Sequence, residues 1–172
     1  MAGQHELDPA RLGDHIDRLY RAAWGLCGSR EEAEDLVQET FARVLRKPRL
    51  LRNDDDISYL LRALRNTFFS SRRAAVRRVQ ATPVGDDLER LADSADSEID
   101  VRIDSARLYA EIAELPPDFR DAVIAIDLVG LSYREAARAL KVREATITTR
   151  LHRARQRVAA TLVAADAAKH EP

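Results

Sequence analysis

The sequence predicts an all-α protein of two small helical domains joined by an acidic flexible linker. One third of the residues are charged, 5% are aromatic and only six are glycine, a composition that favours soluble helices over sheets. In several segments apolar residues recur at intervals of three and four, as they do on one face of a helix. A stretch rich in aspartate separates two groups of such segments and places a domain boundary between them.

The charges are segregated along the chain, although the formal net charge is only −1. Residues 62–78 contain six arginines and no acidic residue, whereas residues 81–104 contain eight acidic residues and two arginines. Residues 134–157 are basic again, with eight lysines and arginines against two glutamates. The two basic segments indicate local sites for a polyanion, which the net charge alone would not suggest.

The first two helices are expected from apolar spacing and from capping residues. Apolar side chains recur over residues 12–26 at intervals of four, three, four and three, and Gly28 ends this helix. Ser29 and Glu32 form a capping box that opens a second helix, which stops before Pro48. The inward face of the first helix is expected to comprise Leu12, Ile16, Leu19, Ala23 and Leu26.

A loop and a third, basic helix follow. Residues 46–56 hold proline, asparagine and three consecutive aspartates and are expected to form the loop, and Asp56 can cap the helix. The apolar stripe of this helix favours a core position for Phe68, whereas Phe69 is left open. A basic helix with aromatic residues suits single-stranded DNA, because freed bases stack while positive charge holds the backbone. The alternative is that the arginines are merely solvated. The residues of this helix that we expect to bind single-stranded DNA are Arg62, Arg65, Phe69, Arg72 and Arg73.

Several functional classes are disfavoured by the sequence. The single cysteine, Cys27, cannot form an internal disulfide, and its apolar neighbours indicate a small buried hydrophobe. The amino terminus lacks the apolar core of a signal peptide, and no apolar run approaches membrane-spanning length, so a cytoplasmic protein without membrane insertion is expected. No paired carboxylate, metal cluster, nucleophile triad or phosphate loop appears, which argues against an enzyme and against a cofactor.

The second half of the chain follows the acidic linker, which spans residues 80–104. A helix is expected to start near Val101 and to be interrupted by the two prolines at residues 116–117. The chain is then expected to restart at Asp118 in a helix that Gly130 closes.

The segment from Phe119 to Val158 is predicted to contain a helix-turn-helix module. Ser132 and Glu135 form a capping box that opens a short helix, and a second helix follows almost at once, from near Glu144. Two helices joined so tightly must cross closely, and a small side chain at the crossing makes that possible. The residues expected to face inward are Tyr133, Ala136, Ala137, Leu140, Ile147, Leu151, Ala154 and Val158.

The outward side of this second helix is expected to read DNA, because an α-helix fits the major groove. Arginines elsewhere on the module can contact phosphates, which adds salt-sensitive affinity without sequence information. The alternative is a helical hairpin with a solvated basic face. A metal-binding role for His152 is disfavoured, because no second ligand is suitably placed. The base-edge candidates are Thr148, Thr149, His152 and Arg153, and the phosphate candidates are Arg134, Arg138, Arg143, Arg150 and Arg155.

Five motifs occur in order along the chain: EDLVQETF (34–41), YLLRALRN (59–66), LPP (115–117), GLSYREAA (130–137) and RLHRAR (150–155). Together they resemble a bacterial extracytoplasmic-function (ECF) sigma factor of RNA polymerase. The resemblance covers about residues 12–162 in the order and spacing of that family.

The resemblance implies a promoter-recognition subunit with two helical domains and no room for the additional domains of larger relatives. Sigma region 2 would occupy residues 8–79, and sigma region 4 would occupy residues 105–165, on either side of the acidic linker. Region 4 would bind the minus-thirty-five element. Region 2 would read and melt the minus-ten element through the loop 47–56 and the helix around Arg62 and Arg65, and Asn66 matches a position that lines the pocket for an extruded base.

The resemblance also implies partners. The helix over residues 30–46 would dock on the clamp helices of the largest subunit of core RNA polymerase, and Asp35, Gln38 and Glu39 would supply polar contacts. Without the resemblance, a solvated acidic helix face would be the better interpretation. Region 4 would touch the flap of the second-largest subunit, the acidic linker would thread the basic channels towards the RNA exit, and an anti-sigma factor would hold the chain inactive.

Three positions depart from the family pattern. Lys141 stands in the turn where glycine is common, so a left-handed backbone there would carry a steric cost. Tyr59 replaces a common tryptophan, and Thr148 replaces a common arginine or lysine. The rival interpretation is a two-domain helix-turn-helix repressor or activator that does not bind core polymerase, and the motif at residues 35–41 discriminates against it.

Overall fold

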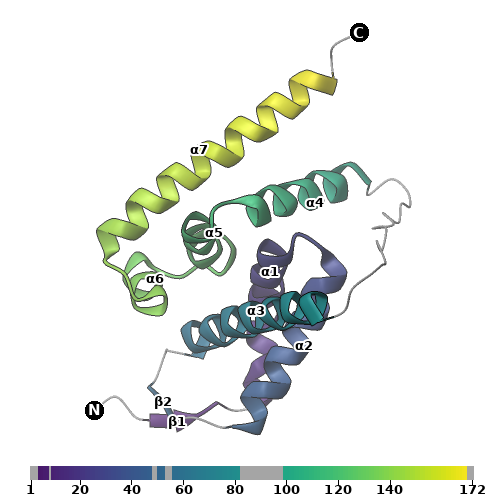
Figure 1. Ribbon diagram of the computed structural model, residues 1–172. Helices are drawn as coiled ribbons and strands as arrows, with labels where there is room; N and C mark the ends of the chain where they lie inside the picture. The colour runs from purple at the N-terminus through teal and green to yellow at the C-terminus, as the bar shows by residue number, and fades with distance from the viewer. Residues whose placement is uncertain (1–3, 8, 48–49, 53–55, 82–98, 170–172) are drawn as a thin grey trace.

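The computed structural model describes residues 4–7, 9–47, 50–52, 56–81 and 99–169, and its fold is all-α as predicted. Figure 1 shows α1, α2 and α3 grouped together, with α4 to α7 lying against one side of that group. We call residues 4–81 the N-terminal half and residues 99–169 the C-terminal half. Most of the expected acidic linker, residues 82–98, lies outside the described residues.

Three α-helices form most of the N-terminal half, and α1 packs against both of the others. The first helix ends as predicted at Gly28, whose φ of 75° and ψ of −3° form a left-handed cap that glycine adopts without steric cost. The second helix begins where the hydroxyl of Ser29 accepts a hydrogen bond from the backbone N–H of Glu32. The bounds are α1 (Ile16–Cys27), α2 (Arg30–Arg46) and α3 (Asp56–Ala81).

The first helix begins later than its apolar pattern predicts. Leu12 is buried, but it lies in a 3₁₀ helix, η1 (Pro9–His15), and not in α1. Ile16, the first residue of α1, is 47% exposed and not part of the core. A 3₁₀ helix turns by about 120° per residue and an α-helix by about 100°, so the apolar face changes direction where the two meet.

Part of the loop expected over residues 46–56 is a strand. A short strand, β2 (Leu50–Arg52), pairs antiparallel with β1 (Gln4–Glu6), and Leu51 stands opposite His5. The side chain of Leu51 is buried. Three residues are too few for an alternating pattern to be recognised in the sequence, which is why this strand was not predicted.

The C-terminal half contains four α-helices and a π-helical turn. The first helix starts at Ile99, two residues earlier than predicted, and the prolines interrupt the chain where expected. The next helix continues into a π-helical turn, in which the backbone N–H of Val129 donates to the carbonyl of Ile124 at 2.9 Å, and Gly130 closes it with φ 75°. The bounds are α4 (Ile99–Glu114), α5 (Pro117–Val123), η2 (Ile124–Leu128), α6 (Tyr133–Leu140) and α7 (Glu144–Lys169).

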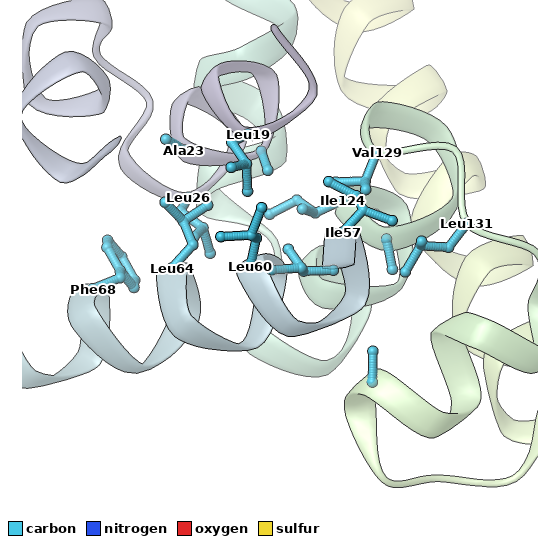
Figure 2. Packing of buried hydrophobic residues seen from close by; sticks show 14 of the residues in the cluster. Leu19, Ala23, Leu26, Ile57, Leu60, Leu64, Phe68, Ile124, Val129 and Leu131 are labelled. Atoms are coloured by element: carbon cyan, nitrogen blue, oxygen red, sulfur yellow. The ribbon is translucent and has the colours of Figure 1, made fainter. Parts of the chain in front are cut away.

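The two halves share one hydrophobic core. Figure 2 shows Leu19 and Leu60 from the N-terminal helices gathered in the same cluster as Ile124, Val129 and Leu131 from the C-terminal half. All five side chains are at most 4% exposed. The elements in contact across the boundary are α1 with α4 and η2, and α3 with α6. The halves are therefore joined by packed side chains as well as by the connecting chain.

Candidate nucleic-acid interface

The helix-turn-helix is built by α6, a tight turn and α7. The backbone N–H of Glu135 donates to the Ser132 hydroxyl at 3.3 Å, and the backbone N–H of Ser132 donates to the Glu135 carboxylate at 2.8 Å. This reciprocal capping box was predicted, and it fixes where α6 begins. Lys141 takes the left-handed conformation, with φ 57° and ψ 44°, and the N–H of Val142 donates to the carbonyl of Ala137 at 3.0 Å.

The capping box also sets the protonation of Glu135. The hydrogen bond from the Ser132 hydroxyl, and then the one from the Ser132 backbone N–H, lower the pKa of the Glu135 carboxyl below its ordinary value. Both bonds favour the charged form, which also suits the N-terminal end of a helix. The start of α6 is therefore held by a carboxylate rather than by a neutral acid.

The second helix of the module, α7, begins at Glu144 as predicted and has two distinct sides. Its inner side packs Ile147, Leu151 and Ala154 against the rest of the C-terminal half. The structure places the four base-edge candidates on the exposed side: Thr148, Thr149, His152 and Arg153. Arg143, a predicted phosphate contact of the same DNA-binding surface, is exposed in the turn that leads into α7. This arrangement is the one that reading of a groove requires.

The two threonines on the exposed side are held by their own helix. The Thr148 hydroxyl donates to the carbonyl of Glu144 at 3.2 Å, and the Thr149 hydroxyl donates to the carbonyl of Ala145 at 3.1 Å. Because each hydroxyl proton is used within the helix, the oxygens retain acceptor capacity for a partner. The two side chains therefore offer acceptors and methyl groups, whereas Arg153 offers donors.

Two of the five predicted phosphate contacts are engaged within the protein. Arg150 pairs with Asp118 at 2.5 Å, and Arg155 pairs with Asp127 at 2.5 and 3.0 Å. These ion pairs tie α7 to α5 and η2.

Tyr133, expected to face inward, is 40% exposed, because the first residue of α6 lies at the edge of the packed face.

The candidates on α3 surround a basic cavity. The cavity has a volume of about 530 Å³, and Asn66, which is exposed, stands at its wall. Four of its lining side chains are cationic, and Tyr59 adds an aromatic ring. This combination suits a nucleotide, because the ring can stack on a base while cations hold phosphate. The lining residues are Arg43, Val44, Lys47, Tyr59, Arg62, Ala63, Asn66, Thr67 and Lys141.

Other candidates on α3 lie further along the helix. Phe68 is buried, as predicted, and the rings of Phe68 and Phe69 meet edge to face at 5.4 Å between centroids. Phe69 is half-buried and lines a second hollow of about 380 Å³ together with Arg72 and Arg73. Arg65 is turned elsewhere: it forms an ion pair with Asp121 of α5, so it faces the C-terminal half.

The predicted docking residues of α2 lie beside the basic helix α3. Asp35, Gln38 and Glu39 are all exposed. Glu39 pairs with Arg43 at 2.6 Å and accepts a hydrogen bond from the Ser71 hydroxyl at 3.2 Å. Two of the three residues, Asp35 and Glu39, line a groove of about 320 Å³ between α2 and α3. The arrangement offers carboxylates beside a partly apolar groove, as a docking partner helix requires.

Sequence reasoning missed the residues that join the halves. Trp24 of α1 stacks on Tyr109 of α4, with ring centroids 4.0 Å apart and planes 8° from parallel. The sequence analysis gave no role to Asp121, although this residue forms an ion pair with Arg65, a predicted DNA contact.

Cys27 is buried as predicted, and burial raises the pKa of its thiol to about 12, which makes it a poor nucleophile. Among the described residues, no helix is long and apolar enough to cross a membrane.

The fold defines a helical protein that carries a helix-turn-helix, formed by α6 and α7, and a second basic helix, α3. Residues 12–78 match the family described as Sigma-70 region 2, and residues 105–158 match Sigma-70, region 4. The ECF RNA polymerase sigma factor EcfG of Rhodopseudomonas palustris is 30% identical, over 86% of this chain and 80% of the relative. The chain belongs to the ECF family of RNA polymerase sigma factors.

Two further relatives agree with this assignment. The ECF RNA polymerase sigma factor SigE of Mycolicibacterium smegmatis is 38% identical over 84% of this chain, which spans 57% of the length of SigE. The solved structure of the sigma factor RpoE in complex with the anti-sigma factor NepR from Bartonella quintana superposes with a TM-score of 0.69. That match has 26% identity and covers 89% of this chain and 94% of RpoE. These comparisons give no support to a repressor that works without polymerase.

Proposed function

We propose that this chain binds core RNA polymerase, directs it to specific promoters and initiates transcription by reading the minus-thirty-five element and melting the minus-ten element. The observation that carries the proposal is the presence of two basic surfaces, on α3 and α7, within the two matched sigma regions. We assign region 2 to residues 8–79, the acidic linker to residues 80–104 and region 4 to residues 105–165. The chain then acts in the cytoplasm as a non-enzymatic initiation factor.

Region 4 reads the minus-thirty-five element with the exposed side of α7. The support is geometric: the inner side of α7 is packed, so the helix is rigid, and its outer side presents a mixture of donors and acceptors. Thr148, Thr149, His152 and Arg153 contact base edges, and Arg143 contacts the backbone at the start of the helix.

Region 2 holds the unpaired strand of the minus-ten element along α3. An extruded base enters the cavity of about 530 Å³, where Asn66 offers an amide to the base edge and Tyr59 offers a stacking surface. Phosphates lie along the remaining arginines of α3. The DNA-binding residues of this region are Arg62, Arg65, Asn66, Phe69, Arg72 and Arg73.

The protein partners are core RNA polymerase and an anti-sigma factor. Asp35, Gln38 and Glu39 dock on the clamp helices of the largest subunit, because their carboxylates and amide stand exposed beside the groove between α2 and α3. Region 4 touches the flap of the second-largest subunit. The anti-sigma partner is supported by the similarity to RpoE, which was solved in complex with the anti-sigma factor NepR.

Run-off transcription tests this function directly. Core polymerase with the purified chain is given genomic DNA fragments, and we expect discrete transcripts that core alone does not make. The double variant Asp35→Lys/Glu39→Lys should abolish the transcripts, whereas Glu34→Lys, also exposed on α2 but not lining the groove, should preserve them. Absence of any transcript with the unmodified chain would contradict the proposal, because a sigma factor must start RNA synthesis.

A further inference from the structure

We propose that the short strand β1 (Gln4–Glu6) is a positioning element for the minus-ten surface: it fixes β2 (Leu50–Arg52) beside the base cavity and so sharpens the selection of the minus-ten sequence. The observation behind the proposal is the antiparallel pairing of these two strands, which are far apart in the chain. The proposal rests on the function proposed above, because it concerns the same base cavity of region 2.

The first strand lies outside the part of the chain that matches the sigma family. The match to Sigma-70 region 2 begins at residue 12, whereas β1 ends at Glu6. Its partner β2 lies within the match, in the segment 47–56 that we expect to read the minus-ten element. A strand from outside the matched region is therefore hydrogen-bonded to a segment with an expected role in DNA binding.

Pairing with β1 satisfies the backbone of β2. Each of the three residues of β2 stands opposite one residue of β1, with Leu51 opposite His5 at the centre. Among the described residues, β1 is the only strand that shares a sheet with β2. Without β1, the backbone groups of β2 would depend on water for these hydrogen bonds, and its residues would regain the conformational freedom that the ladder removes.

Buried leucines hold the strand pair against the helices of region 2. A two-stranded sheet is at best marginally stable by itself in water. Here Leu7, which follows β1 directly, Leu12 of η1 and Leu51 of β2 are each 7% exposed and belong to the hydrophobic core. The second strand also contacts α3, and η1 contacts α1. The pair is therefore anchored on region 2 by packed side chains.

The anchored strand lies between two walls of the base cavity. Lys47, at the end of α2, and Tyr59, near the start of α3, both line the cavity, and β2 lies between them in the chain. The start of α3 is fixed as well, because Asp56 and Ile57 are buried. A fixed β2 therefore restrains the connection between these two walls of the site.

Fixing β2 in advance favours discrimination between bases. When a binding segment is ordered before its ligand arrives, the loss of conformational entropy does not reduce the affinity for the correct ligand. Groups that contact a base discriminate well only when packed neighbours hold them in place. Loss of β1 should therefore weaken the response to the minus-ten sequence. It should leave the reading of the minus-thirty-five element unchanged, because the exposed side of α7 belongs to region 4.

The first experiment removes the strand from the full chain. The templates are a promoter found by run-off transcription with the unmodified chain, and two copies in which either the minus-ten or the minus-thirty-five element is scrambled. We expect deletion of residues 2–6 to lower the preference for the intact minus-ten element about tenfold, the effect of leaving one more residue to be ordered on binding. Preference at the minus-thirty-five element should not change, which shows that the variant is folded and binds core polymerase.

The matched control keeps the strand and changes its side chains. The triple substitution Gln4→Thr/His5→Val/Glu6→Thr introduces residues that favour strands, so the main-chain pairing with β2 remains. We expect this variant to select the minus-ten element as the unmodified chain does. A loss equal to that of the deletion would overturn the proposal, because it would assign the effect to side chains and not to the pairing of the strands.

Two proline variants test the pairing without shortening the chain. Alternate residues of a strand direct their N–H groups to opposite edges, so His5 faces one edge, and Gln4 and Glu6 face the other. Only one of the variants His5→Pro and Gln4→Pro/Glu6→Pro therefore removes N–H groups that face β2, and proline is tolerated where the N–H faces solvent. We expect one variant to reproduce the deletion and the other to resemble the unmodified chain. Equal behaviour of the two would overturn the role of the ladder, and this comparison decides the question if the deletion prevents folding.

The outcomes separate this proposal from the function on which it rests. If the unmodified chain starts transcription and the deletion keeps full selectivity at the minus-ten element, the role of β1 is wrong and the function stands. Higher selectivity after the deletion would also overturn the proposal, because it would mean that β1 obstructs the cavity. If the unmodified chain starts no transcription with core polymerase, the proposed function fails, and the role of β1 fails with it.

Discussion

The two proposed DNA-binding helices differ in what covers them. The reading side of α7 faces outward, and α5 and α6 lie between that helix and α3 (Figure 1). The corresponding side of α3 faces region 4, where Asp121 binds Arg65 and Lys141 borders the base cavity. One chain therefore presents one surface that is open to duplex DNA and one surface that is partly occupied by its own neighbour.

This difference indicates an order of events. We expect duplex DNA to reach α7 without any change in the arrangement of the two regions, because the predicted reading residues are exposed and the elements packed against α7, namely α4, α5 and α6, all belong to region 4. Binding of an unpaired strand to α3 requires Arg65 to exchange a carboxylate for a phosphate. We therefore expect recognition of the upstream element to precede capture of the downstream strand.

The largest expected effect comes from the core beneath α3. Leu60 is fully buried in the cluster of Figure 2, so Leu60→Ala should lower the free energy of unfolding by about 2–5 kcal/mol. Urea unfolding followed by Trp24 fluorescence measures this loss, because Trp24 lies in the adjoining helix α1. The matched variant Leu151→Ala, in α7, should shift the same transition less. A larger shift from Leu151→Ala would show that the core of region 4, not that of region 2, controls the environment of Trp24.

The next effect concerns the selectivity for DNA sequence of the exposed side of α7. Arg153→Ala should weaken discrimination between a promoter and a scrambled minus-thirty-five duplex by about 1–3 kcal/mol, through loss of a base contact. Competition binding with both duplexes measures it, and Gln156→Ala, exposed on the same helix, is the control. An equal loss on every duplex would assign Arg153 to a phosphate instead.

Features with a local signal could be predicted from the sequence. The capping box of Ser132 and Glu135, the left-handed cap at Gly28 and the start of α7 at Glu144 each depend on residues within one turn. The exposed side of α7 followed from the same periodicity that placed Ile147 in the core. Where the local geometry changed type, as at the junction of η1 and α1, the same periodicity failed.

The interface between the regions could not be predicted in this way. Arg65 and Asp121 are 56 residues apart, and nothing in either segment marks the other as its partner. Charge patterning placed Arg65 on a basic face but did not show that a carboxylate of region 4 would reach it. One signal was available: Gly25 lies inside an apolar helix, where glycine is unfavourable unless another element approaches closely.

A smaller effect is expected on α3, at the base cavity beside Asn66. Asn66→Ala should impair open-complex formation by about 0.5–1.5 kcal/mol, the usual contribution of one hydrogen bond, and should spare duplex binding. Permanganate reactivity of unpaired thymines near the start site measures the opening. Unchanged permanganate reactivity would exclude a base contact by Asn66.

The smallest effect concerns the capping box of Ser132 and Glu135, which holds the start of α6 in the helix-turn-helix. The Ser132 hydrogen bonds lower the pKa of Glu135, so this carboxylate stabilises the fold above its unfolded pKa near 4.5, and the stabilisation is lost as the pH falls through the lower folded pKa. Glu135→Gln should therefore cost about 0.3–1 kcal/mol at pH 7, the usual value of a charge at a helix N-terminus, and the difference from the unmodified chain should shrink below pH about 4.5. Thermal unfolding followed by circular dichroism between pH 7 and 3.5 measures the difference. A gap between the two chains that stays constant across this range would mean that the charge of Glu135 does not hold the start of α6.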